Sequence, residues 1–153
     1  MTPRRVLPVV LALAAALAVL VLWPKKASSP EDEIRALVAE CVRAANAHAV
    51  GDIAEHLAED FKGPQGARKS EVKQMLAYQL LRQGEVAVVF NPTLEVDVPA
   101  DSQGHLVGHF VFGRVPAKSV NELPQGSVSA IYRIEANLAR RDGQWIFVDA
   151  KYE

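Results

Sequence analysis

The stretch S-V-S-A-I-Y-R-I-E-A-N-L-A-R-R-D-G-Q-W-I-F-V-D-A-K-Y, residues 127–152, decides the fold. Apolar and polar side chains alternate on both sides of Asp142-Gly143. This period of two is typical of a β-strand with one buried face. An Asp-Gly pair between two such runs favours a tight turn. The stretch therefore predicts a long β-hairpin that closes the domain.

The length of the turn decides which side chains of this hairpin face the core. A three-residue loop, 141–143, makes one face uniformly apolar, and glycine suits its third position. We therefore predict this loop. The inner side chains would then be Tyr132, Ile134, Ala136, Leu138, Ile146, Val148, Ala150 and Tyr152. A two-residue loop, 142–143, is the alternative, and it would turn Asp149 inward beside Ala136.

The other face of the predicted hairpin combines charged and apolar side chains. Glu135 lies diagonal to Lys151, and Arg133 lies diagonal to Asp149, so opposite charges meet across the strands. The large apolar side chains of this face are Ile131, Trp145 and Phe147. Contiguous exposed apolar surface on a small domain marks a contact site. We therefore predict that these three residues form a homodimer interface or a partner interface.

The N-terminal segment predicts a membrane attachment. Residues 6–23 carry no charge and lie between Arg4-Arg5 and Lys25-Lys26. An uncharged run of this length is just long enough to span a bilayer and longer than the apolar part of a secretory signal. We predict an uncleaved signal-anchor in residues 1–26. The domain, residues 27–153, would lie on the outer side of a cytoplasmic (inner) membrane, and a cleaved signal peptide is the alternative.

Composition excludes several classes of function. Four of the 17 basic residues precede residue 27, whereas all 18 acidic residues follow it. The domain is therefore acidic, without the basic stripe that a nucleic-acid-binding surface requires. Cys41 is the single cysteine, which rules out an internal disulfide. Its helical apolar context predicts a small buried hydrophobe, and no His or Cys spacing suggests a metal or cofactor site.

Helical periodicity dominates the first half of the domain. Ser29 is a suitable N-cap, and the apolar residues that follow recur at helical spacing until Gly51 interrupts them. Asp52 would cap a second, shorter helix that places Ile53, Leu57 and Phe61 on its inner side. A third helix is predicted from Ser70 to Gly84. Its inner face would consist of Val72, Met75, Leu76, Gln79 and Leu80.

From Glu85 the hydrophobic period changes to two. One predicted strand places Val86, Val88, Phe90, Leu94, Val96 and Val98 on a common face. Pro92 within it indicates a sheet edge or a bulge, because proline cannot donate a ladder hydrogen bond. A further strand is predicted over 105–115, followed by a loop over 116–126. Three helices followed by four strands define an α+β domain with an antiparallel sheet.

In this order the elements resemble the nuclear transport factor 2-like superfamily, whose fold is also called cystatin-like. The resemblance rests on A-V-G-D (49–52), L-A-E-D-F (57–61) with G-P-Q-G (63–66), S-E-V-K-Q-M-L (70–76) and R-R-D-G-Q-W-I-F-V (140–148), and it spans residues 31–152. It implies helices packed on a curved sheet that forms a cone. The superfamily includes isomerases, dehydratases, polyketide cyclases, ligand binders and assembly modules. The layout also resembles bacterial members that are anchored by one membrane span.

The resemblance implies that an enzyme of this type holds an Asp or His base inside the cone, beside tyrosine donors. No carboxylate is predicted to point inward. We therefore expect a non-enzymatic domain that binds a partner or a small apolar ligand. The alternative is an isomerase-, cyclase- or dehydratase-like enzyme for a small hydrophobic substrate. The candidate pocket residues are Tyr78, Tyr132, Tyr152 and His48.

Overall fold

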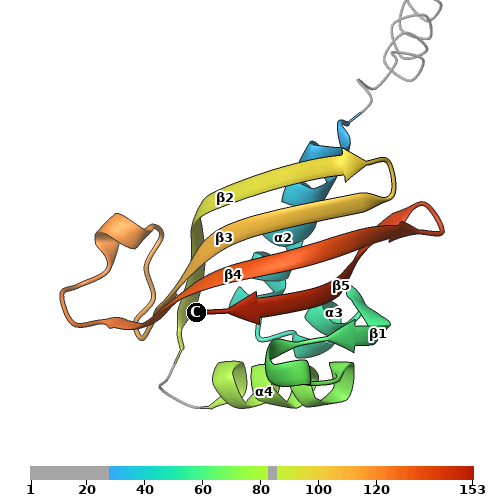
Figure 1. The fold of residues 1–153 in the computed structure, drawn as a ribbon. Coiled ribbons are helices and arrows are strands. Elements are labelled where there is room, and N and C mark those ends of the chain that lie inside the picture. The colour runs from blue at the N-terminus through green and yellow to red at the C-terminus, as the bar shows by residue number, and fades with distance from the viewer. Residues whose placement is uncertain (1–27, 83–85) are drawn as a thin grey trace, which may run out of the picture.

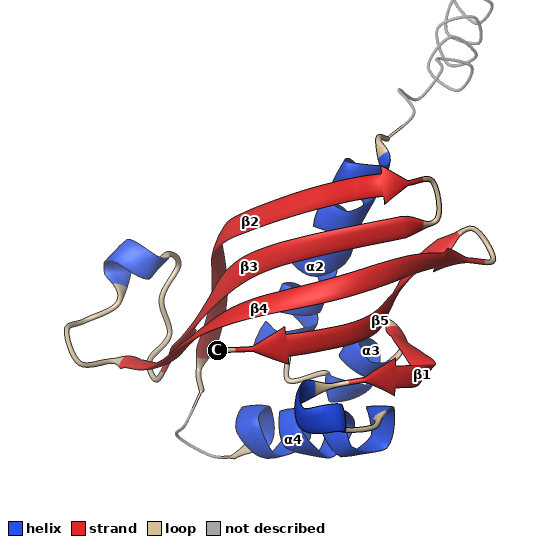
Figure 2. Cartoon of the chain, in the orientation of Figure 1, coloured by secondary structure: helices blue, strands red, loops and turns tan. Residues whose placement is uncertain are grey.

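The computed structural model describes residues 28–82 and 86–153, which form helices packed on one curved sheet (Figure 1). The elements in chain order are α2 (Pro30–Asn46), α3 (Val50–Ala54), β1 (Leu57–Lys62), α4 (Lys69–Leu81), β2 (Val88–Ala100), β3 (Gln103–Gly113), β4 (Val128–Arg141) and β5 (Gln144–Tyr152), with 3-10 turns at Pro64–Gly66 and Val120–Glu122. The sheet order is β1-β5-β4-β3-β2. Figure 2 shows α2, α3 and α4 on the same side of the sheet. The predicted α+β class is confirmed.

Helix α2 begins as its sequence predicts. The Ser29 hydroxyl accepts a hydrogen bond from the Asp32 N–H at 3.1 Å, and Pro30 occupies the first turn. Its buried face packs on the sheet, where the core cluster consists of Ile34, Leu37, Val38, Leu106, Ala136, Leu138 and Trp145. This cluster packs α2 against the middle strands. It includes no residue of α4.

The predicted second helix is wrong beyond its first turn. Helix α3 ends at Ala54, and Leu57 begins strand β1, which pairs in parallel with β5. The Phe147 N–H donates to the His56 carbonyl at 2.9 Å. The edge of β5 thus supplies hydrogen-bond partners for the backbone of β1. The apolar spacing within residues 53–61 cannot reveal this pairing, because β5 is distant in sequence. The sheet consequently has five strands, and one of its pairings is parallel.

The predicted turn of the closing hairpin is also wrong. Arg141 pairs directly with Gln144, so the loop contains only Asp142 and Gly143. Both residues have positive φ angles, 53° and 76°. A two-residue hairpin turn with this geometry matches the right-handed twist of the flanking strands, and Asp-Gly is among its preferred sequences.

Beyond Phe147, a β-bulge reverses the facing that the two-residue turn would give to the rest of β5. Leu138 pairs with Phe147, whereas Asn137 pairs with Asp149, so Val148 is an extra residue in β5. The bulge turns Asp149 to the same face as Asn137 and away from the helices. An extra residue shifts the period-two pattern by one position. The two-residue loop therefore does not carry Asp149 into the cone.

The two-residue turn corrects the predicted interface, because it sets Phe147 opposite Leu138 and so turns Trp145 and Phe147 toward the core. Trp145 is only 8% exposed and belongs to the core, and Phe147 packs against the same cluster. Ile146 and Val148, predicted to face the core beside Leu138, instead pack against the Leu57, Ala58 and Phe61 cluster. Of the three predicted interface residues, only Ile131 lies on the outer surface, where it is 60% exposed.

Pro92 predicted either a sheet edge or a bulge, and β2 shows both an edge position and an irregular register. Strand β2 is an edge strand, and its register with β3 shifts between Phe90 and Thr93. The apolar residues before this shift therefore do not share a face with those after it, although the sequence had predicted that they would. Val89 enters the core, while Phe90 pairs with Val111 on the opposite face.

The predicted membrane span, residues 6–23, lies outside the described residues. Within residues 28–82 and 86–153, none of the helices has both the length and the apolar character that crossing a membrane requires.

Candidate ligand-binding cavity

Two adjacent cavities lie between α4 and the inner face of the sheet. The mouth cavity has a volume of about 590 Å³, and the inner cavity, which extends toward α2, has a volume of about 210 Å³. The side chains that line both are Phe61, Val72, Leu76, Gln79, Phe112, Ile134 and Ala150. Because the two spaces share these walls, they lie next to each other.

Three of the four predicted pocket residues line the mouth cavity. The ring of Tyr132 packs edge-on against Phe112 and Tyr152, with centroid distances of 5.2 Å and 5.4 Å. Such edge-to-face contacts fix the ring positions. Tyr78 lies at the rim, 64% exposed, and its hydroxyl accepts a hydrogen bond from Arg82 at 2.6 Å. That these tyrosines bind a ligand stays a prediction.

His48 does not line either cavity. It follows the end of α2 with a positive φ of 56°, and its Nδ1 lies 2.7 Å from the Leu80 carbonyl oxygen. A carbonyl only accepts, so Nδ1 carries the proton and donates. His48 therefore ties the end of α2 to the end of α4. Its predicted place at the pocket is wrong.

Three residues of α4, Glu71, Gln74 and Gln79, give the mouth cavity a polar character that the tyrosines alone do not supply. Glu71 lines the mouth cavity, and its Oε2 accepts the Arg68 N–H at 2.7 Å as a helix cap. Gln79 is half-buried, and its amide has no hydrogen-bond partner among the described residues. The signal for Gln79 was present in the sequence, since it is a polar residue on the predicted apolar face of this helix.

Cys41 lines the inner cavity as a neutral thiol. Burial raises its pKa to about 12, and the neighbouring carboxylate of Glu40 adds to this increase. At neutral pH the thiolate is therefore a negligible fraction, and the thiolate is the reactive form of cysteine. Cys41 accordingly contributes apolar wall to the cavity.

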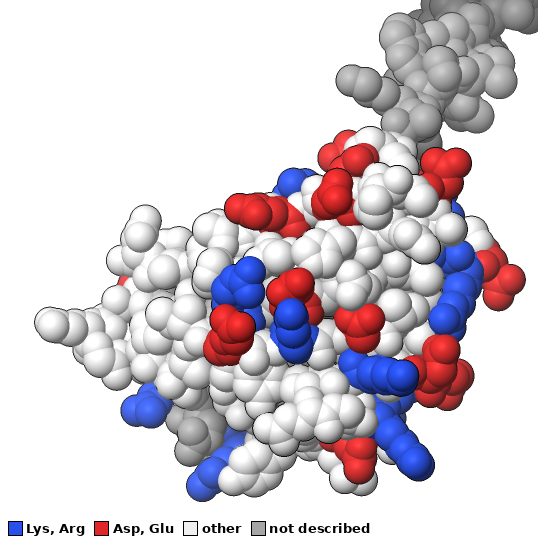
Figure 3. Space-filling model, viewed as in Figure 1, with Lys and Arg blue, Asp and Glu red and all other residues white. Residues whose placement is uncertain are grey.

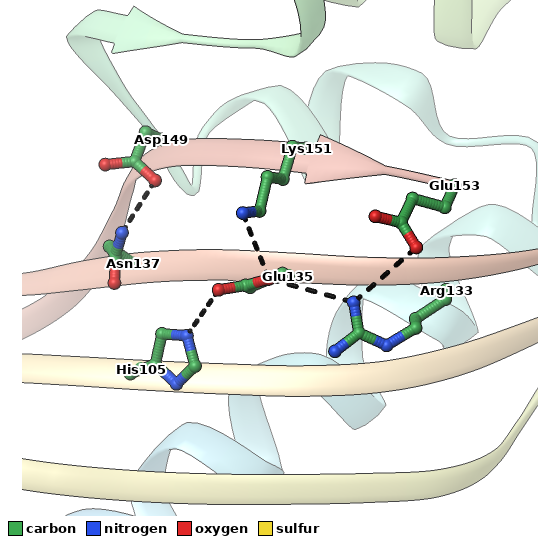
Figure 4. A network of polar contacts seen from close by, with 7 residues as sticks. All are labelled: His105, Arg133, Glu135, Asn137, Asp149, Lys151 and Glu153. Atoms are coloured by element: carbon green, nitrogen blue, oxygen red, sulfur yellow. Dashed lines mark hydrogen bonds and ion pairs between the residues drawn. The ribbon is translucent and has the colours of Figure 1, made fainter.

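The carboxylates of the closing hairpin face away from the cavity. Glu135 lies at the centre of a polar network on the outer face of the sheet (Figure 4), with His105 at 3.1 Å and Lys151 at 3.2 Å. Its hydrogen bonds to His105 and Lys151 lower the pKa of this carboxyl. Asp149 accepts a hydrogen bond from Asn137 at 2.9 Å on the same face.

Figure 3 views this outer face, where acidic and basic side chains alternate across the middle strands. No group of three or more His, Cys, Asp or Glu side chains within the described ranges is placed to hold a metal ion.

No protein-family model and no curated protein matches the sequence. Solved structures do match. An NTF-2 like protein of unknown function from Shewanella oneidensis has a TM-score of 0.64 at 12% identity, over 81% of this chain and 98% of that one. Aln2 from a Streptomyces species has a TM-score of 0.65 at 13% identity, over 84% and 93% of the two chains.

A third similar structure carries an enzyme's name. It is a candidate scytalone dehydratase from Novosphingobium aromaticivorans, with a TM-score of 0.56 at 13% identity, over 79% of this chain and 80% of that one. At these identities the likeness shows the fold alone. The protein therefore has the nuclear transport factor 2-like, cystatin-like fold, which fits either ligand binding or catalysis.

Proposed function

We propose that this protein is a non-enzymatic, membrane-anchored ligand-binding domain that faces outward and holds a small apolar molecule in the adjacent cavities. The observation that carries the proposal is the pair of adjacent, largely apolar cavities between α4 and the sheet. Ligand sites in proteins are concave, mostly apolar and supplied with a few polar groups. The tyrosine hydroxyls and the Gln79 amide are such groups here.

The burial of apolar surface supplies the driving force. A ligand that removes about 300 Å² of apolar surface from water, counting both partners, gains about 7–8 kcal/mol. Several kcal/mol of this are lost to immobilising the ligand. We therefore expect a dissociation constant of about millimolar or weaker for a ligand that makes apolar contacts only, and a tighter one where a hydrogen bond is added.

The carboxylates support binding over catalysis. A general base must lie within about 2.6–3.2 Å of the proton that it abstracts, or one water away. Glu135 and Asp149 are on the outer face of the sheet, bonded to other side chains. Glu71 reaches the mouth cavity, and it is the residue on which the alternative of an isomerase-, cyclase- or dehydratase-like enzyme rests.

Bound ligand is expected in the full chain purified from its native host. Native mass spectrometry should show a small extra mass that Ile134→Trp removes, because Ile134 lines both cavities and the larger ring reduces their volume. Ile131→Trp is the matched control, since it adds the same ring to the outer face of the same strand. Circular dichroism would establish that both variants are folded.

Two results would contradict this proposal. A full chain that carries no small molecule, and that gains none when apolar compounds are added, has no ligand function at this site. A bound compound that is chemically converted, with turnover lost in Glu71→Gln, would establish the enzyme instead.

We further expect an N-terminus inside and a C-terminus outside the cytoplasmic membrane. The proposal is supported by the uncharged run 6–23 after Arg4-Arg5. Alkaline phosphatase fused after Glu153 should be active, whereas green fluorescent protein at the same position should be dark. The opposite pair of signals would place the domain in the cytoplasm.

A further inference from the structure

We propose that the exposed side of α4 is a homodimer interface, in which the α4 helices of two copies pack antiparallel about a two-fold axis. This inference goes beyond the proposed ligand-binding function and does not depend on it. The interface would consist of six exposed residues, which we call the α4 stripe: Glu71, Gln74, Met75, Tyr78, Leu81 and Arg82.

Both sides of α4 carry large apolar side chains. Leu76 and Leu80 pack toward the sheet in a core cluster. Met75, Tyr78 and Leu81 face outward and are 45%, 64% and 57% exposed. A helix that is apolar on all sides is normally covered on all sides. These three residues gather on one helix face, and an exposed apolar group of this kind marks a contact surface.

The α4 stripe contains a seam with the spacing of a coiled coil. Glu71, Met75, Tyr78 and Arg82 follow one another at intervals of four, three and four residues. Arg82, the C-cap residue, donates a hydrogen bond to the Tyr78 hydroxyl at 2.6 Å, and its guanidinium lies 5.3 Å from the centroid of that ring. These contacts place Arg82 and Tyr78 on the same face. A second helix could therefore pack along the whole length of α4.

The charges at the two ends of this seam make it self-complementary. In an antiparallel pair centred midway along the seam, Glu71 of each copy faces Arg82 of the other, and Met75 faces Tyr78. A parallel pair would instead set Glu71 against Glu71 and Arg82 against Arg82, and contacts between like charges are unfavourable. The Oε2 atom of Glu71 accepts the Arg68 N–H, and a carboxylate has a second oxygen for the contact with the other copy.

A second copy fits the α4 stripe better than a membrane surface does. Figure 1 shows α4 and the start of α2 at opposite ends of the domain. The predicted membrane anchor precedes α2, so α4 would point away from the membrane that holds it. A membrane surface attracts basic residues, whereas this seam has an acid at one end and a base at the other. The antiparallel register also keeps Arg68 of the two copies about 25 Å apart along the helix axis, which limits their repulsion.

Charge reversal tests the antiparallel register in the full chain. Sedimentation equilibrium in a detergent of matched density reports the mass of the protein alone, and we expect twice the chain mass for the unmodified protein. Glu71→Arg and Arg82→Glu should each raise the dissociation constant of the dimer about tenfold or more, because each sets like charges together at both ends of the seam. An equal mixture of these two variants, with different affinity tags, should form one-to-one dimers, since both ends then pair opposite charges.

A second pair of variants tests the interface without altering the helix cap. Tyr78→Glu places a carboxylate in the middle of the seam and should give a monomer. Ile131→Glu is the matched control, because Ile131 is 60% exposed on the outer face of the sheet, and it should remain a dimer. Circular dichroism would establish that each variant is folded.

Four results would overturn the inference. A monomeric unmodified chain, or a dimer that Tyr78→Glu leaves intact, has no homodimer interface at α4. Dissociation by Ile131→Glu alone would assign the contact to the outer face of the sheet. A mixture of the charge variants that stays monomeric would exclude the antiparallel register. A monomeric chain that loses a different protein from its native host through Tyr78→Glu would assign α4 to that partner instead.

Discussion

Replacing Trp145 with aspartate is expected to unfold the domain. The ring of Trp145 is buried in the main core cluster, and its indole N–H donates to Glu33 at 2.9 Å. The guanidinium of Arg140 lies over the ring, 4.9 Å from its centroid, and also pairs with Glu33. Loss of a buried tryptophan alone costs about 3–5 kcal/mol.

The new carboxylate adds to this cost because it would lie beside Glu33 in a largely buried site. The total is comparable with the roughly 5–15 kcal/mol that stabilises a typical domain. We expect Trp145→Asp to lose the cooperative thermal transition that the unmodified chain shows by near-ultraviolet circular dichroism.

Ile131→Asp is the control, because its side chain is exposed on the outer face of β4. It should leave the transition within a few degrees of its original temperature. If Ile131 lies at a dimer or partner interface, as the sequence predicts, this variant should lower the mass in sedimentation. A folded Trp145→Asp protein would show that the indole is dispensable to the core.

Deletion of Val148 is expected to leave the facing of β5 unchanged. Val148 is the extra residue of the β5 bulge, between the pair of Phe147 with Leu138 and the pair of Asp149 with Asn137. Without Val148 these two pairs become neighbours in a regular ladder, so Phe147 stays in the core and Asp149 stays on the outer face. The expected loss is that of the apolar contact between Val148 and the Leu57, Ala58 and Phe61 cluster, about 1–2 kcal/mol.

Urea unfolding of the deletion variant should therefore remain cooperative, with a midpoint close to that of Val148→Ala. Val148→Ala keeps the bulge and is the matched control, with an expected loss of about 1–2 kcal/mol. A deletion variant without a cooperative transition would show that the bulge itself is required for the pairing of β5.

The candidate site could be predicted from the sequence in part. Tyr132 and Tyr152 have the inner parity of the hairpin, and Tyr78 lies on a helix whose spacing is regular, so local periodicity was enough to bring them together. His48 was placed wrongly because its left-handed backbone turns the ring to the Leu80 carbonyl. Gln79 could have been singled out as a polar residue on an apolar helix face, but only the cavity shows that its amide has no partner among the described residues.

By itself the sequence determined the α+β class, the capped start of α2, the edge position of β2 and the presence of a hairpin at Asp142-Gly143. Each of these depends on residues close together in the chain: an N-cap hydroxyl, a proline without an N–H, or an alternation with a period of two. Tertiary structure alone decided the turn length, the bulge at Val148 and the pairing of β1 with β5. These features depend on which apolar side chains bury the most surface against α2 and β1. Such burial involves contacts between segments that are distant in sequence, so local patterns do not predict it.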